Sequence, residues 1–257
     1  MSNKSSLFIR MKSPTLSDSA LKSMNVFDKK SSYQAQVLAR KNCSDCKGIY
    51  NPGSIEEGIY DNSEHIGPWT GWQGNLDAEL MVIGQDWGGN KYFEDKKGME
   101  TDNNPTNVRL KQLLEEVNPE FKIEMPKDSS GQGIFYFTNA ILCCREGLLT
   151  ENKKTKTGPV KSRWFRNCEN RLKAQIELVD PKVIVTLGYF AYRSVLSSFE
   201  LHPEPRMRDA IKTDPIQLSG CRGVVVPVYH CGNNGSRSRS LEQQKADWKR
   251  VKAALLL

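Results

Sequence analysis

The 257-residue sequence lacks the apolar run of about 18 residues that a membrane-spanning helix needs. It also lacks an acidic tail, which excludes a strongly acidic solvating protein. The first twelve residues contain one three-residue apolar island, which is too short for the core of a secretory signal. We therefore expect an intracellular protein, cytoplasmic and associated with the nucleoid, with no membrane partner.

Histidine is scarce, with only three residues, whereas cysteine is present seven times. In a reducing intracellular compartment thiols stay free, so the seven cysteines do not indicate a disulfide framework. They are instead buried thiols, metal ligands or part of a reactive site.

The positive charge of the chain is concentrated in one segment. The chain has 37 Lys and Arg against 30 Asp and Glu, a net charge of +7. Between Lys153 and Lys173 there are eight basic residues and one acidic residue, so this segment alone carries the whole excess. Trp164 and Phe165 lie among these cations, a pattern that favours nucleic acid as partner, although a solvated helix face gives the same pattern.

Four short apolar runs rich in β-forming residues predict the strands of a parallel sheet, because both faces of such strands are buried. They are Glu79–Gly84, Ile134–Ala140, Val183–Leu187 and Gly223–Tyr229. Pro227 lacks an N–H group, which places it at an edge of the sheet or at the end of its strand.

Amphipathic patterns around these strands predict five helices: 32–41, Asn107–Val117, Ser162–Val179, Tyr189–Phe199 and Leu241–Leu256. Strands that alternate with helices indicate a three-layer α/β/α sandwich with a central, mainly parallel four-stranded sheet. We expect residues 1–30 to form a loosely ordered lead-in, possessing at most a short helix at 17–26, and residues 31–257 to form a single domain. The segment Lys153–Pro159 is expected to be a mobile loop, and nothing in the sequence suggests more than a monomer.

Polar residues follow three of the predicted strands at their carboxyl ends. Asp86 follows the first strand, Asn139 lies at the end of the second, and His230 follows the fourth. Ligands of open α/β sheets bind at this edge, so the convergence of an acid, a carboxamide and an imidazole predicts a site there. Each residue taken alone is better explained as a cap of a helix or turn, and only the convergence of the three favours a site.

The cysteines predict a metal site. Cys43 and Cys46 form a C-x₂-C pair, and Cys168 lies in the basic helix. With either Cys143 or Cys144 these residues give four thiolates, enough for zinc or an iron–sulfur cluster. The gap of about a hundred residues after the C-x₂-C pair differs from a compact zinc ribbon.

The order and spacing of these motifs resemble the iron–sulfur type of the uracil-DNA glycosylase superfamily. The matching segments cover roughly residues 40–255, and they are Gly84–Gly88, Asn104–Thr106, Thr138–Cys143, Cys168, Asp180–Gly188 and Tyr229–His230. The resemblance implies a DNA repair glycosylase that hydrolyses the N-glycosidic bond of uracil or another deaminated base. It also implies a structural [4Fe–4S] cluster on Cys43, Cys46, Cys143 and Cys168, in which Cys143 is favoured because it lies four residues after Asn139. Zinc is the alternative metal.

The resemblance also implies roles for the residues at the strand ends. Asp86 orients the attacking water and stabilises the cationic sugar, while His230 donates to the base oxygen on which charge develops. Asn139 reads the edge of the base. Gln85, Trp87 and Gly88 contact the base through the loop after the first strand. Phe93 or Tyr92 is a candidate for stacking on the base, and ordinary packing explains either ring equally well.

DNA is the expected partner, held by residues of the basic segment and of the loop after His230. These are Lys161, Arg163, Arg166, Asn234, Arg237 and Arg239.

Gln85-Asp86 is more similar to the first motif of the cluster-free members of the superfamily. The sequence also departs from the family motifs where Trp87-Gly88 replaces Pro-Tyr, and where Cys231 follows the histidine in place of proline. These departures keep a second hypothesis open, a glycosylase-like protein that binds DNA or a nucleotide without excising a base. A third is a zinc-stabilised nucleic-acid-binding protein.

Overall fold

The computed structural model describes residues 26–54, 75–95, 104–119, 135–149 and 155–257. The first described element, helix α2 (Val26–Lys41), begins inside the predicted lead-in. Lys29 on this helix pairs with Asp77 at 2.9 Å, so the folded domain starts at least five residues earlier than 31. The possible helix at 17–26 lies almost wholly outside the described residues.

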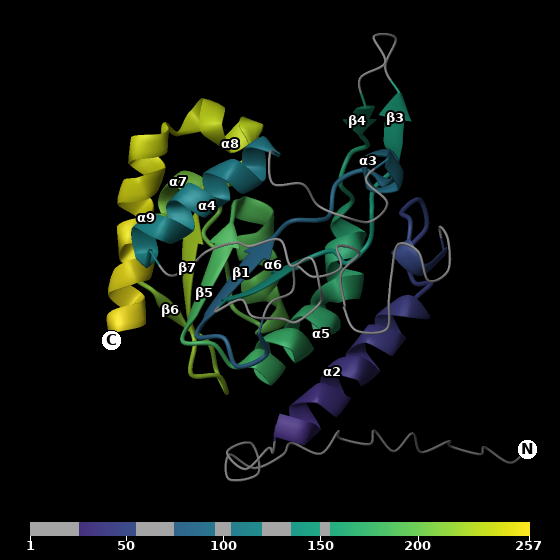
Figure 1. Cartoon of the computed structure of the whole chain (residues 1–257), viewed down its shortest axis with the longest axis horizontal. Helices are drawn as coiled ribbons and strands as arrows, with labels where there is room; N and C mark the ends of the chain where they lie inside the picture. Colours follow the sequence, from purple (N-terminus) through teal and green to yellow (C-terminus); the bar gives the residue numbers. More distant parts are fainter. Residues whose placement is uncertain (1–25, 55–74, 96–103, 120–134, 150–154) are drawn as a thin grey trace, which may run out of the picture.

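A five-stranded sheet with the order β2-β1-β5-β7-β6 forms the centre of the molecule (Figure 1). Its strands are β1 (Leu80–Gly84), β2 (Phe135–Asn139), β5 (Val183–Leu187), β7 (Val224–Val228) and β6 (Ile216–Gln217). The first four are the predicted strands and are parallel to one another. The expected count of four is corrected to five, because the two-residue strand β6 adds antiparallel to β7 and is too short to show a sequence period.

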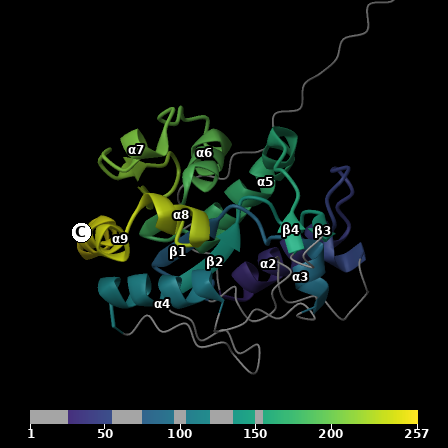
Figure 2. The same ribbon diagram turned by 90° about the horizontal axis from the view of Figure 1, so that it is seen from above.

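Helices cover both faces of the sheet (Figure 2), which makes the predicted three layers. One face packs against α4 (Pro105–Val117) and α9 (Leu241–Leu256), with Trp248 fully buried between helix and sheet. The other face packs against α2, α5 (Ser162–Val179) and α6 (Tyr189–Ser198). The central strands are wholly buried, which is why their apolar runs are continuous.

Pro227 lies inside β7, one position from its end. The N–H of Val224 donates to Lys182 of the β5 side, and the carbonyl of Val228 accepts from Gly188, so even-numbered residues of β7 bond to β5. Pro227 therefore faces the opposite side, where β6 pairs only with Val224 and Val225. The missing N–H leaves no gap in the ladder, in agreement with the predicted edge position.

The ends of two helices are fixed by local sequence. Asn104 caps α4 by accepting from the N–H of Thr106 at 2.9 Å, and Pro105 occupies the first turn, where no N–H partner is needed. Ser240 and Gln243 form a capping box at the start of α9. These caps position α4 beside the carboxyl edge of the sheet.

Four short helices and one hairpin complete the described part of the chain. They are η1 (Pro52–Ser54), α3 (Asn90–Asp95), α7 (Met207–Ala210), α8 (Asn233–Ser238) and the hairpin β3 (Gly147–Leu149) with β4 (Thr155–Thr157). Residues 155–157, which we expected in a loop, thus belong to a strand, while Lys153 and Lys154 lie outside the described residues. Among the described helices, none is both long enough and apolar enough to cross a membrane.

Candidate active site

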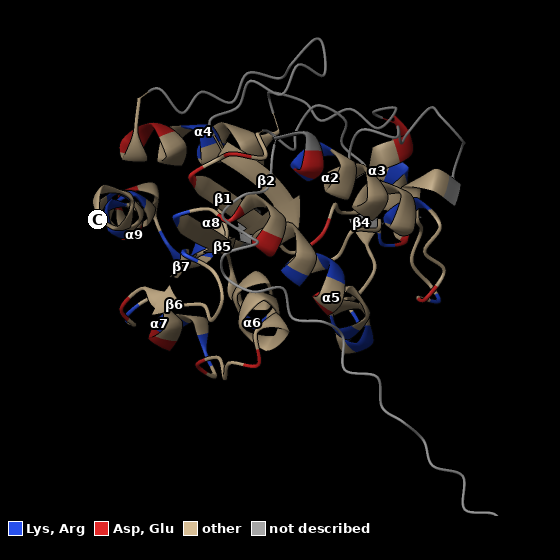
Figure 3. Cartoon of the chain, turned by 90° about the horizontal axis from the view of Figure 1, so that it is seen from below, with Lys and Arg blue, Asp and Glu red and all other residues tan. Residues whose placement is uncertain are grey.

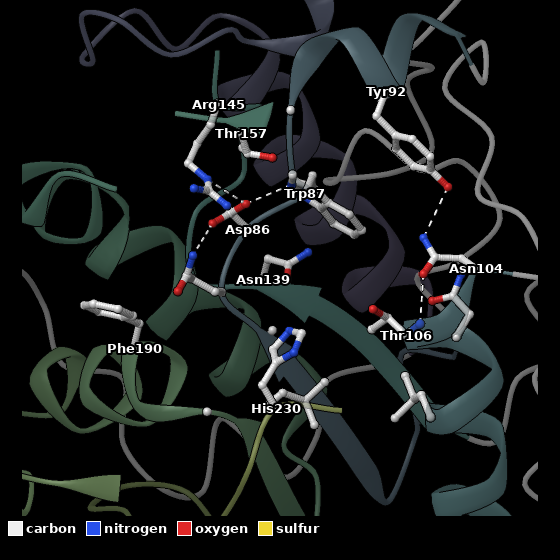
Figure 4. Close-up of a pocket in the computed structure, with 18 of the residues that line it drawn as sticks. Asp86, Trp87, Tyr92, Asn104, Thr106, Asn139, Arg145, Thr157, Phe190 and His230 are labelled. Atoms are coloured by element: carbon white, nitrogen blue, oxygen red, sulfur yellow. Dashed lines mark hydrogen bonds and ion pairs between the residues drawn. The ribbon is translucent and has the colours of Figure 1, made fainter. Parts of the chain in front are cut away.

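A cavity of about 760 Å³ opens at the carboxyl edge of the sheet (Figure 4). Asp86, Asn139 and His230, which follow or end three different strands, all line this cavity. The predicted convergence of the three residues is therefore confirmed. The tertiary reason is the parallel register, in which Gly84 at the end of β1 pairs with Asn139 at the end of β2.

The Asp86 side chain is only 3 % exposed and holds the loop after β1 together. Its Oδ1 accepts from the N–H of Gly88 at 2.8 Å and pairs with Nε of Arg145 at 3.0 Å. Its Oδ2 accepts from the Gln85 amide at 2.5 Å. The loop turns at Gly88, whose φ of +82° is unfavourable for residues with a Cβ.

Arg145 is a site residue that the sequence reasoning missed. Besides Asp86, its guanidinium donates to the carbonyl of Gly158 at 2.6 Å, and its backbone N–H donates to Gly88. No sequence signal connects residue 145 to residue 86, because only the path of the chain after β2 brings the two together.

Asn139 is 3 % exposed and lies directly over Gly84. A Cβ on Gly84 would stand 2.2 Å from the Asn139 Oδ1, so the absence of a side chain at residue 84 makes room for the carboxamide. Among the described residues the carboxamide has no hydrogen-bond partner. The carboxamide lines the cavity, so it is free to pair with a ligand that supplies one donor and one acceptor.

Replacing Gly84 with alanine should therefore displace the Asn139 carboxamide while leaving the strand intact. We expect a loss of ligand binding of at least about tenfold, since a misplaced buried amide no longer meets its partner. The measurement is affinity for a uracil-containing oligonucleotide, the ligand expected from the sequence, together with the melting temperature. Gly158→Ala is the matched control, because its backbone is not left-handed and its added Cβ meets only Glu146, at 3.4 Å or more.

His230 presents a neutral imidazole to the cavity. Its Nδ1 accepts from the N–H of Gly232 at 2.8 Å, which places the ring proton on Nε2. Burial lowers the pKa of His230 below its ordinary value of 6.5, and the negative charge of Asp86 opposes this only in part. The carbonyl of His230 packs so closely on α8 that a Cβ at Gly235 would overlap it, which explains a glycine there.

The remaining predicted base contacts divide into two groups. Gln85, Trp87 and Gly88 line the cavity, as does Tyr92, whose hydroxyl accepts from Asn104 at 3.2 Å. Phe93, by contrast, is fully buried in the core beneath α3 and does not line the cavity. Its proposed stacking role is corrected to ordinary packing.

Three further aromatic residues line the cavity, Phe137, Tyr189 and Phe190, and none of them was predicted from the sequence as a site residue. Phe137 on β2 meets Trp87 edge-on at 5.9 Å between ring centroids and lies deep in the site. Phe190, at the start of α6, lies at the rim. Phe137 could have been found from its position two residues before Asn139, which places both side chains on the same face of β2.

The four predicted cysteine ligands lie near one another. Burial raises the pKa of Cys143 to about 12 and that of Cys168 to about 11, and each is raised further by the other cysteines of the set. Cys46 accepts a hydrogen bond from Asn167 of α5 at 3.2 Å. Cys144 lies instead in the apolar core, where its backbone pairs with Tyr50.

Within the described ranges, no three His, Cys, Asp or Glu side chains are arranged to hold a single metal ion. The four thiols are therefore neighbours, but they are not arranged around a single position that one metal ion could occupy. The cysteines outside this set, Cys144, Cys221 and Cys231, are free thiols as well.

The basic segment continues along α5, whose ribbon is blue at its Lys and Arg positions in Figure 3. Lys161 is exposed at the start of the helix, with Nζ 5.4 Å from the ring centroid of Trp164. Arg163 donates to the carbonyl of Lys47 at 2.9 Å and so ties α5 to the cysteine loop. Arg166 is exposed and has no hydrogen bond or ion pair with the described residues.

The predicted loop after His230 is helix α8, in which Asn234 and Arg237 lie, with Arg239 directly after it. Arg237 is exposed, whereas Arg239 makes two hydrogen bonds to Asp247 of α9, at 2.5 and 2.6 Å. Its guanidinium also lies 5.4 Å from the Tyr229 ring centroid. Arg239 is therefore corrected from a phosphate ligand to a residue that anchors α8 to α9.

The two arginines should respond differently to substitution. Arg239→Ala should lower the free energy of unfolding by about 1–3 kcal/mol, because it leaves the mostly buried Asp247 carboxylate without its charged donor. Arg237→Ala should leave stability unchanged and weaken binding to DNA with a smaller salt slope. Chemical denaturation and a salt titration of binding distinguish them; equal stability of the two variants would contradict the anchoring role.

The cavity at the carboxyl edge of the sheet, lined by the Asn139 carboxamide, the His230 imidazole and the Asp86 carboxylate, lies where α/β folds bind their ligands. A family model described as the uracil DNA glycosylase superfamily matches residues 72–253. This range is well over half of the chain, so the protein belongs to the uracil DNA glycosylase superfamily. A search of curated proteins gave no match.

Proposed function

We propose that the protein is a DNA glycosylase that hydrolyses the N-glycosidic bond of uracil or another deaminated base in DNA. The observation that carries the proposal is the Asn139 carboxamide, which lines the cavity with His230 and has no hydrogen-bond partner among the described residues. Membership of the superfamily supports the reaction class. The exposed cations of α5, Lys161 and Arg166 among them, support DNA as the partner.

Asn139 would select the base. Its amide offers one donor and one acceptor in fixed geometry, a match for the acceptor O4 and donor N3 of uracil. Cytosine presents the reverse pattern and would leave buried groups unpaired. The rings of Phe137 and Trp87 beside it provide apolar surface for a base extruded from the stack.

His230 would stabilise the departing base. With Nδ1 occupied by the Gly232 N–H, Nε2 carries the proton and can donate to the base oxygen on which negative charge develops. A neutral donor suits this task, because its proton is held throughout the reaction and the base leaves as an anion.

Asp86 would position the water and oppose the positive charge that develops on the sugar. Its Oδ2 has a single partner among the described residues, Gln85, and retains a lone pair for a water molecule. Arg145 holds the carboxylate in this orientation and would act as a positioning residue rather than a catalytic one.

Cys43, Cys46, Cys143 and Cys168 would hold a [4Fe–4S] cluster, with zinc as the alternative. The thiols fit such a group in chemistry, since burial and, to a smaller extent, neighbouring thiols raise the pKa of Cys46, Cys143 and Cys168, and a cation would be needed to hold these thiols as thiolates. When bound, the group would supply a structural tie between the cysteine loop and α5.

Release of free base from a uracil-containing oligonucleotide tests the proposed activity. We expect Asp86→Asn to lower the rate by about 10²–10⁴-fold, because the carboxylate no longer opposes the sugar charge or orients water. Arg145→Lys is the matched variant that keeps a cation beside Asp86 and should retain much more activity. No base release by the wild-type protein from any deaminated base would refute the proposal.

A second candidate function, binding without excision, is favoured by one observation. Asp86 is paired with Arg145 and has little exposure, so part of its negative charge is already compensated. Tight binding of uracil-containing DNA with no product would support this alternative.

A further inference from the structure

Phe190 differs from the other apolar residues of α6. Ala191, Tyr192, Val195 and Leu196 are all buried, whereas the Phe190 ring is 40 % exposed. It lies at the rim of the cavity, on a different element from Asn139 and His230 (Figure 4). An exposed aromatic ring beside a binding cavity indicates a surface that a partner covers.

Phe165 and Tyr189 pack against the Phe190 ring and hold it in place. Phe165 of α5, only 3 % exposed, stacks on Phe190 with 5.4 Å between centroids and 8° between planes. Tyr189 meets the edge of Phe190 at 6.1 Å. Because Phe165 covers one face, the exposed area belongs to the opposite face and the rim of the ring, and the ring needs little ordering on binding.

The surroundings of this stack are cationic. The Arg193 guanidinium lies 5.5 Å from the Phe190 centroid and 5.8 Å from that of Phe165, and it makes no hydrogen bond or ion pair with the described residues. The exposed side chain of Arg166 lies one residue from Phe165 on the same basic helix. An aromatic platform edged by unpaired arginines fits a nucleic-acid strand, whose bases stack while its phosphates pair with the cations.

We propose that Phe190, backed by Phe165 and flanked by Arg193, stacks on the nucleobase adjacent to the extruded one. This inference rests on the proposed function, since it assumes a DNA strand at the cavity. The inner rings, Phe137 and Trp87, are almost fully buried and lie where the extruded base would enter. Phe190 lies outside these two rings, where the neighbouring nucleotide of the same strand would pass. The Phe190–Phe165 stack would then occupy the space that the extruded base leaves.

The test is a double-mutant cycle on binding of single-stranded oligonucleotides with one uracil. In two further oligonucleotides an abasic nucleotide replaces the base on the 5′ or the 3′ side of that uracil. We expect Phe190→Ala to weaken binding of the complete oligonucleotide by about 5–100-fold, the range of base–aromatic stacking. It should have no effect with one of the two abasic oligonucleotides, because the stacking partner is then already absent.

Phe190→Trp should retain the affinity, and Leu38→Ala is the control for loss of an exposed apolar side chain outside the cavity. Equal losses for Phe190→Ala on all three oligonucleotides would overturn the proposal, as would no loss on any. Because binding is measured, a protein that binds but does not excise still gives a result. A failure of the proposed function therefore appears separately, in the base-release assay.

Discussion

His230→Ala is expected to lower the rate of base release by about 10²–10³-fold, the usual cost of removing a donor that stabilises developing negative charge. The imidazole lines the cavity, with its proton placed on Nε2 by the Gly232 N–H. The measurement is single-turnover release of base from a uracil-containing oligonucleotide. His202→Ala is the control, since this histidine lies outside the cavity lining.

The activity should also fall on the acid side of the pH profile, where His230 gains a proton. Burial lowers the pKa of His230, so the imidazole stays neutral in the folded protein at pH values just below 6.5, where the unfolded chain already binds the proton. The contribution of His230 to the free energy of unfolding is therefore complete above the ordinary pKa of 6.5, and it is lost as the pH falls towards the lowered pKa. Protonation also turns Nδ1 into a donor, which breaks its bond from Gly232. An acid limb of activity that persists unchanged in His230→Ala would contradict this role.

Cys143→Ala is expected to abolish iron binding and to lower the melting temperature by about 10 °C or more, because loss of a metal group removes folding free energy. Iron and inorganic sulfide should be present in equal amounts in the wild-type protein and absent in the variant. The zinc content of the same two proteins tests zinc as the alternative metal.

Two other cysteines provide matched controls for this experiment. Cys144→Ala should keep the iron but lose stability through a core cavity, since Cys144 is fully buried and packs in the apolar core. Cys221→Ala should change neither property, because this half-buried thiol lies away from the four-cysteine set. A wild-type protein without iron, or a Cys143→Ala variant that retains it, would contradict the cluster assignment.

The candidate site was predictable to the extent that strand ends are predictable. Asp86, Asn139 and His230 were identified because each follows or ends an apolar strand, and parallel strands bring their carboxyl ends to one edge. Arg145 and Phe190 were not, because their roles depend on contacts across the fold. Phe93 and Arg239 were misassigned for the same reason. The local sequence does not distinguish an aromatic ring that faces a ligand from one that packs in the core, as Phe93 does. Nor does it distinguish an arginine that binds a phosphate from one that pairs with an aspartate, as Arg239 does.

The sequence by itself determined the four parallel strands, the main helices and the order of the motifs, because continuous apolar runs and amphipathic periods are local properties. Only the tertiary structure decided which polar groups are already paired. Asp86 meets Arg145 and Arg239 meets Asp247, while Asn139 has no described partner. Hydrogen bonds and ion pairs between distant residues depend on ångström-scale positions that no local pattern contains. For that reason the chain alone predicted where a site lies, and the fold indicated which side chains in it are available to a ligand.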